Sequence, residues 1–89
     1  MTADQVLQVL DAWGLDDQQR AQLLNQPDPD QVITIHDGLH RIFAGNPGHA
    51  DAWPLKPNRA FGGRSALEVM LSGDIKQVRQ YVMYHVYNA

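Results

Sequence analysis

The sequence contains no cysteine among its 89 residues. This absence excludes a disulfide framework, a thiolate metal site and a cysteine nucleophile, and it suits a reducing compartment. Long apolar runs are missing too, because no stretch approaches the roughly 18 apolar residues that a membrane span requires. The first residues carry acids where a secretory signal carries bases. We therefore expect a soluble, cytoplasmic protein that has no membrane partner.

Basic residues are also few. Seven Lys and Arg stand against ten Asp and Glu, which gives a formal net charge of −3 with neutral histidines. This balance gives the chain no general attraction to polyanions, so nucleic acid is a disfavoured partner. The hydrophobic share of 44% is typical of a globular chain with one small core. Because so small a core supplies only a few kcal/mol of stability, we expect a homo-oligomer or a hetero-oligomer.

Apolar residues recur at helical spacing along the chain. The spacing predicts helices over residues 4–13, 16–25, 30–44 and 47–53, a short helix between Ser65 and Gly73, and a last helix that starts at Asp74. In the second of these, Ala21, Leu23 and Leu24 are expected to face inward. The third contains β-branched residues, but no second strand-like run is available for pairing. The sequence predicts an all-α fold, a small compact bundle of about five to six short helices.

The stretch PNRAFGGRSALEVMLSGD, residues 57–74, raises the question of a phosphate loop. Gly62 and Gly63 are followed by Arg64 and Ser65, without Walker spacing and without a preceding strand. The alternative is a structural corner, in which a glycine adopts a positive φ and Ser65 forms a capping box with Glu68. Turn chemistry favours the corner.

Histidines offer the other candidate for chemistry. His36 and His40 are four residues apart, so they share a helical face and would bind a metal if His49 or Asp51 supplied a third ligand. The pattern lacks the HExxH glutamate and a clear third ligand, so it favours ordinary surface histidines and predicts no metal. The chain is also short for a walled cleft beside its core. We expect neither a cofactor nor enzymatic activity.

The C-terminal segment KQVRQYVMYHVYNA is rich in large side chains. Tyrosines, a methionine and a histidine spread around the predicted helix beside a stripe of valines, so not all of them can face the core. Tyr, Met and Arg are enriched at protein interfaces. A last helix buried on two sides of a small bundle would use the same composition, and the two interpretations stay open.

The segment WPLKPNRAFGGRSALEVMLSGDIKQVRQYV resembles the Xre/MbcA/ParS-type antitoxin toxin-binding domain. That family's pattern runs from a tryptophan through a Pro-Asn turn and a Gly-Gly-Arg-Ser corner to a short leucine-rich helix, a glycine stop and a final helix. The residues that fall on the pattern are Trp53, Pro57, Asn58, Phe61, Gly62, Gly63, Ser65, Leu67, Leu71, Gly73 and Val78.

Upstream, IHDGLHRIF and VLDAWGLDDQQRAQLLN resemble the family's preceding helices more loosely. In longer members the first helices belong to a helix-turn-helix, but here the acidic QPDPDQ stands where the recognition helix would follow. This departure argues against DNA binding by the chain alone. The resemblance implies one antitoxin domain over residues 1–89, with truncated helix-turn-helix-like helices in 1–45 and a toxin-binding region in 46–89.

The resemblance also implies a function. Such a domain is the antitoxin of a type II toxin–antitoxin pair and neutralises a RES-domain toxin, an enzyme that degrades NAD, by covering it near its active site. The alternative is a DNA-binding regulator of its own operon. The toxin-binding residues implied are Asn58, Arg59, Gly63, Arg64, Ser65, Arg79, Tyr81, Tyr84, Tyr87 and Asn88, with Ala89 approaching the cleft. The structural corner would comprise Trp53, Pro57, Phe61, Gly62 and Gly73.

Overall fold

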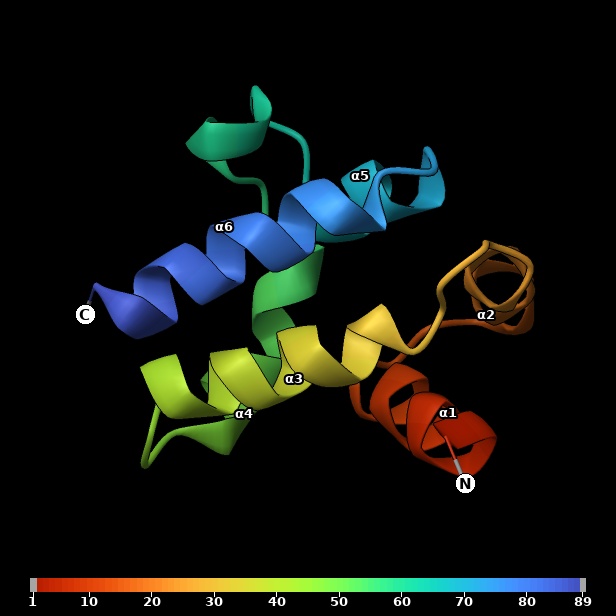
Figure 1. Cartoon of the computed structure of the whole chain (residues 1–89), viewed down its shortest axis with the longest axis horizontal. Coiled ribbons are helices and arrows are strands. Elements are labelled where there is room, and N and C mark those ends of the chain that lie inside the picture. Colours follow the sequence, from red (N-terminus) through yellow and green to blue (C-terminus); the bar gives the residue numbers. More distant parts are fainter. Residues whose placement is uncertain (1, 89) are drawn as a thin grey trace.

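The structure, a computed structural model, describes residues 2–88 and contains helices throughout that range (Figure 1). The elements are α1 (Thr2–Ala12), α2 (Asp17–Leu24), α3 (Gln31–Ile42), α4 (Pro47–Ala52), the 3₁₀ helices η1 (Trp53–Leu55) and η2 (Arg59–Phe61), α5 (Ala66–Leu71) and α6 (Ile75–Tyr87). Residues 2–88 include no strand, and none of their helices has the length and apolarity to cross a bilayer. The predicted all-α fold is confirmed.

Side-chain caps fix where the helices begin. Ser65 accepts a hydrogen bond from the Glu68 N–H at 3.1 Å and Glu68 accepts one from the Ser65 N–H at 2.8 Å, which confirms the capping box predicted for α5. Asp16 and Gln19 form a second capping box at α2. Asp74 accepts from the Gln77 N–H and caps α6. Each cap satisfies backbone donors that would otherwise lack partners.

Two helices form the centre of the molecule. α3 and α6 share the most extensive contact between elements, and they run side by side in the same direction (Figure 1). Ile35 and Leu39 from α3 and Val78 and Val82 from α6 are buried and belong to one core cluster. A Cβ atom on Gly38 would lie 2.6 Å from Val82 Cγ1, a distance that real Cβ atoms essentially never show. Gly38 therefore permits the close approach of the two helices.

The N-terminal helices cover this pair from one end. α1 packs against α3 and α2 packs against α5 (Figure 1). Leu10 and Leu23 are fully buried, so both helices contribute to the same core. The prediction that Ala21 and Leu24 face inward is wrong, because Ala21 is exposed and Leu24 is 39% exposed. Successive helical residues point about 100° apart, so this two-turn helix turns Leu23 inward and Leu24 outward.

Candidate functional site

The glycine-rich stretch forms a closed corner between η1 and α5. The Asn58 N–H donates to the Arg64 carbonyl at 3.0 Å and the Gly63 N–H donates to the Asn58 carbonyl at 3.0 Å. Gly62 and Gly63 have φ of +69° and +88°, in the left-handed region that favours glycine. The predicted positive φ is therefore confirmed, and it occurs at both glycines.

The backbone donors of this corner are already used. The N–H groups of Gly62, Gly63 and Arg64 donate to carbonyls within the corner at 3.1, 3.0 and 3.3 Å. The Ser65 N–H donates to the Glu68 carboxylate. A phosphate cradle requires such amides to be free for the anion. The geometry therefore supports a structural corner and leaves no donor set for a phosphate at residues 62–65.

Aromatic rings join the corner to the last helix. The rings of Trp53 and Tyr81 stack with centroids 5.9 Å apart, and the Phe61 ring lies 5.2 Å from Tyr81 and 6.4 Å from Trp53. Phe61 is buried, whereas Trp53 and Tyr81 are half-buried. Aromatic pairs at these separations add stability beyond the area that they bury. Tyr81 thus fixes the corner against the middle of α6.

The remaining corner residues divide into exposed and structural ones. Arg59, Gly63 and Arg64 are exposed. Asn58 is half-buried, and its side chain accepts a hydrogen bond from the Ala60 N–H at 2.9 Å. Ser65 is 6% exposed, so its hydroxyl serves the cap of α5 and offers little surface to a partner. The exposed arginines are the groups of this corner that a partner can reach.

The C-terminal end of α6 carries exposed tyrosines. Tyr84 is 64% exposed and Tyr87 is 78% exposed, which makes them the most exposed large hydrophobic side chains among residues 4–88. Asn88 is exposed and donates to the Tyr84 carbonyl at 2.8 Å, and Arg79 is exposed one turn or more before them. This end of α6 lies at the opposite end of the molecule from α1 and α2 (Figure 1). Ala89 lies outside the described residues.

Two shallow hollows flank the tyrosines of α6. One, of about 230 Å³, lies between α3 and α6 and is lined by Thr34, Asp37, Gly38, Arg41, Met83, Val86 and Tyr87. The other, of about 180 Å³, is mostly apolar and is lined by Leu39, Ile42, Phe43, Trp53, Tyr81, Val82 and His85. Sequence reasoning missed both hollows because they depend on how α3 lies against α6. Tyr87 lines the first hollow and Tyr81 lines the second.

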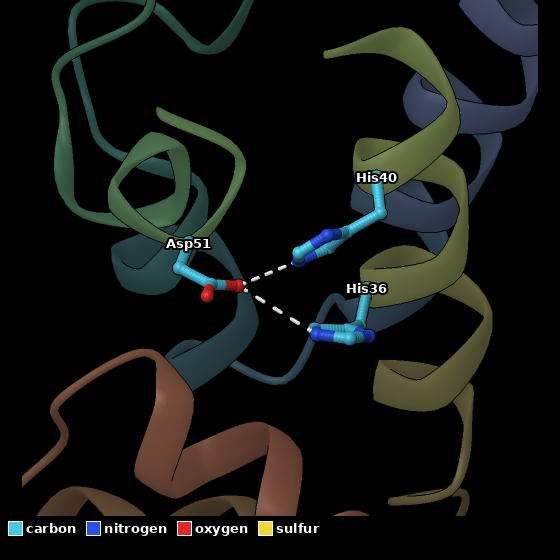
Figure 2. Close-up of side chains that lie close together, drawn as sticks. All are labelled: His36, His40 and Asp51. Atoms are coloured by element: carbon cyan, nitrogen blue, oxygen red, sulfur yellow. Dashed lines mark hydrogen bonds and ion pairs between the residues drawn. The ribbon is translucent and has the colours of Figure 1, made fainter. Parts of the chain in front are cut away.

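A polar cluster lies where α3 faces α4. Figure 2 shows His36 and His40 from α3 pointing toward Asp51 of α4, with Asp51 Oδ1 lying 3.6 Å from His36 Nε2 and 2.8 Å from His40 Nε2. His49, the other third ligand considered from the sequence, instead stacks on Phe43 with ring centroids 4.3 Å apart. The i, i+4 histidines thus meet a carboxylate from a separate helix.

The fold and these surfaces define a small all-α domain with a rigid corner and an exposed aromatic helix end. A family model described as the antitoxin Xre/MbcA/ParS C-terminal toxin-binding domain matches residues 39–85, just over half of the chain. The chain belongs to this family, which confirms the resemblance seen in the sequence. No curated protein and no solved structure matches the chain.

The match covers the corner, the aromatic contact and most of α6. It begins within α3 at Leu39 and ends at His85, so α1 and α2 lie outside it, as do Tyr87 and Asn88. The match to the toxin-binding family thus covers only the C-terminal half of the molecule.

Proposed function

We propose that this chain is the antitoxin of a type II toxin–antitoxin pair and that it neutralises a RES-domain toxin that degrades NAD. In this proposal the C-terminal end of α6 covers the entrance to the toxin's active site, and the chain acts by binding, without catalysis of its own. The observation that carries the proposal is the exposure of Tyr84 and Tyr87 on the last helix of a toxin-binding domain.

Tyrosines at this position suit an interface. Tyr84 and Tyr87 are three residues apart, so they lie on one side of α6 and together offer a contact of aromatic surface. Tyrosine is enriched among the residues that dominate interface energies. Isolated exposed apolar residues are common on protein surfaces, but neighbouring aromatic rings beside hollows are typical of a docking surface.

The helix that carries the tyrosines is packed against the rest of the domain along one side. Ile75, Val78 and Val82 are buried along one side of α6, and Tyr81 is held by Trp53 and Phe61. A partner that binds this helix therefore does not have to order it, which lowers the entropic cost of association. In this proposal Asn58, Gly63 and Ser65 act indirectly, by maintaining the corner against which Tyr81 packs.

Two exposed arginines lie in the corner and one lies on α6. Arg59, Arg64 and Arg79 are exposed, and none of them takes part in the ion pairs formed within residues 2–88. Arginine forms paired hydrogen bonds with carboxylates, so these residues are proposed contacts at the rim, where they add specificity. The net charge of −3 gives a modest attraction to a basic toxin surface. We propose a hetero-oligomer with the toxin as the working assembly.

The test is co-expression with the product of the adjacent gene. We expect the chain to restore growth, to co-purify with a RES-domain toxin and to abolish its consumption of NAD. The double variant Tyr84→Ala/Tyr87→Ala should weaken the complex by about 10- to 100-fold. The matched control is Leu7→Ala, which removes a 40% exposed apolar side chain from α1 and should leave affinity unchanged.

Two outcomes would overturn the proposal. One is that no RES-domain protein is neutralised or captured, and the other is that the tyrosine variant protects cells as well as the wild type does. A gel shift with the operon's promoter addresses the alternative function. A shift by the isolated chain would support DNA-binding regulation over toxin neutralisation as its primary activity.

A further inference from the structure

We propose that His36, His40 and Asp51 form a binding site for a divalent transition metal, with Zn²⁺ as the ion that fits best. The three side chains come from α3 and α4 and converge on one point (Figure 2). This proposal does not depend on the toxin, because it concerns the chain alone. It departs from the expectation drawn from the sequence, in which the third ligand was not evident.

The donor set suits zinc. Two imidazole nitrogens and one carboxylate oxygen are ligands that Zn²⁺ takes in proteins, and three protein ligands leave a coordination position for water. The set does not suit Mg²⁺ or Ca²⁺, which prefer oxygen ligands throughout. Zinc is therefore the ion to test first, with Mg²⁺ as the matched ion that should not bind.

The spacing is close to that of a metal site. One ligand atom from each residue lies within 4.8 Å of the others. A tetrahedral ion with bonds of about 2.0–2.2 Å holds its ligand atoms roughly 3.3–3.6 Å apart. His36 Nε2 and Asp51 Oδ1, at 3.6 Å, already have nearly that separation, whereas His40 Nε2 and Asp51 Oδ1, at 2.8 Å, share a hydrogen bond. A metal would replace the proton of that bond after a small rotation of the side chains.

The surroundings allow this adjustment and give an ion access. His36, His40 and Asp51 are each about one-quarter to one-third exposed, so their side chains can turn without repacking the core. The other ring nitrogen of His36, Nδ1, lies 3.5 Å from the Asp37 carboxylate. A carboxylate beside the ring nitrogen that does not bind the metal orients the imidazole and raises its basicity. A hollow of about 250 Å³, lined in part by Gln5, Ile33 and His36, opens beside the cluster.

A bound ion would link α4, a short helix, to α3. α4 has six residues and leads directly into Trp53, which stacks on Tyr81. Linking Asp51 to His36 and His40 would hold α4 against α3 and so limit the movement of the segment that carries Trp53. Metal binding to the folded chain would also raise its stability by mass action.

The test is titration of the untagged full chain with Zn²⁺ in a calorimeter, beside thermal melting. At a zinc concentration about tenfold above the dissociation constant, the Tm should rise by roughly 5–10 °C. His36→Gln, His40→Gln and Asp51→Asn should each weaken binding by about tenfold or more. His49→Gln, which changes a histidine outside the cluster, should bind as the wild type does, and Mg²⁺ should give no signal.

A spectroscopic measurement keeps the proposal testable if a variant loses stability. Co²⁺ in a tetrahedral nitrogen and oxygen site gives strong visible absorption, which the wild type should show and zinc should displace. Circular dichroism of each variant without metal shows whether it folds. The proposal is overturned if the wild type shows no saturable zinc binding, or if the His36→Gln/His40→Gln double variant, shown to be folded, binds zinc as tightly as the wild type.

Discussion

The N-terminal helices and the C-terminal half of the molecule use their apolar residues differently. α1 and α2 place Val6, Leu10 and Leu23 in the core, and each of these two helices exposes a single leucine, at 39–40%. The C-terminal half buries its own stripe on α6 and also exposes Tyr84 and Tyr87 together at the end of that helix. The first region buries most of its large apolar side chains in the core, whereas the second also exposes two neighbouring aromatic side chains that a partner can contact.

This difference agrees with the limits of the family match. Residues 39–85 match the toxin-binding family, and α1 and α2 lie outside that range. Both regions nevertheless contribute to a single core cluster. Changes in α1 and α2 should therefore alter stability, and changes at the end of α6 should alter binding at nearly constant stability.

The largest effect is expected for Leu23→Ala. Leu23 is fully buried, and removing it leaves a cavity that costs about 2–5 kcal/mol of unfolding free energy. Leu24→Ala is the matched control, because the Leu24 side chain is 39% exposed. This variant should lose much less unfolding free energy than Leu23→Ala does. Urea denaturation measures both. Equal losses would mean that α2 does not contribute to the core through Leu23 as described.

A smaller loss is expected where α3 meets α6. Gly38→Ala gains helix propensity of about 1 kcal/mol, but its Cβ at 2.6 Å from Val82 forces overpacking that costs roughly 1–3 kcal/mol. We expect a net loss of stability in thermal or urea unfolding. Gly48→Ala, with its nearest neighbour at 3.9 Å, should be neutral or stabilising. If both variants gained stability, the close contact of α3 with α6 would be disproved.

A third loss of stability is expected when a side chain is introduced at the corner, where Gly62 has a positive φ. Gly62→Ala places a side chain at φ +69° and is expected to lose about 1–2 kcal/mol, since a Cβ is disfavoured in that conformation. Gly62→Asn should lose less, because asparagine tolerates the left-handed region better. Chemical denaturation of the two variants checks the order. An alanine variant as stable as the wild type would show that the corner adopts another turn.

The smallest effect on stability is expected at the proposed docking surface. Tyr84→Ala/Tyr87→Ala should change the unfolding free energy by no more than about 0.5 kcal/mol, because both rings are largely in solvent. Urea denaturation of the chain without its partner measures this directly. A loss as large as that of Leu23→Ala would show that these rings belong to the core, and the contrast between the two regions would fail.

Much of the fold was predictable from local signals. The capping residues Ser65 and Asp74 and the stop at Gly73, with φ +102°, marked the boundaries of α5 and α6. These features depend on neighbours within a few residues, so a sequence reveals them. The family pattern of the corner was recognisable for the same reason.

The remaining features depend on which elements meet. The sequence showed that some tyrosines must leave the core, but only the placement of Trp53 and Phe61 distinguishes the packed Tyr81 from the exposed Tyr84. Similarly, the sequence offered both His49 and Asp51 as partners of His36 and His40, but only the turn between α3 and α4 decides that Asp51 is the one that approaches them. A glycine within a helical pattern was the available clue to the close contact at Gly38.

The position of α3 has a consequence for how this domain can be divided. The family match starts at Leu39, in the middle of α3, yet Val32 and Ile35 from the same helix are fully buried. A fragment that began at the match would sever the helix and uncover the partners of those side chains. The segment that the family model matches is thus shorter than the part of the chain that builds the core around it, and a recombinant version of the matched segment should begin before residue 31.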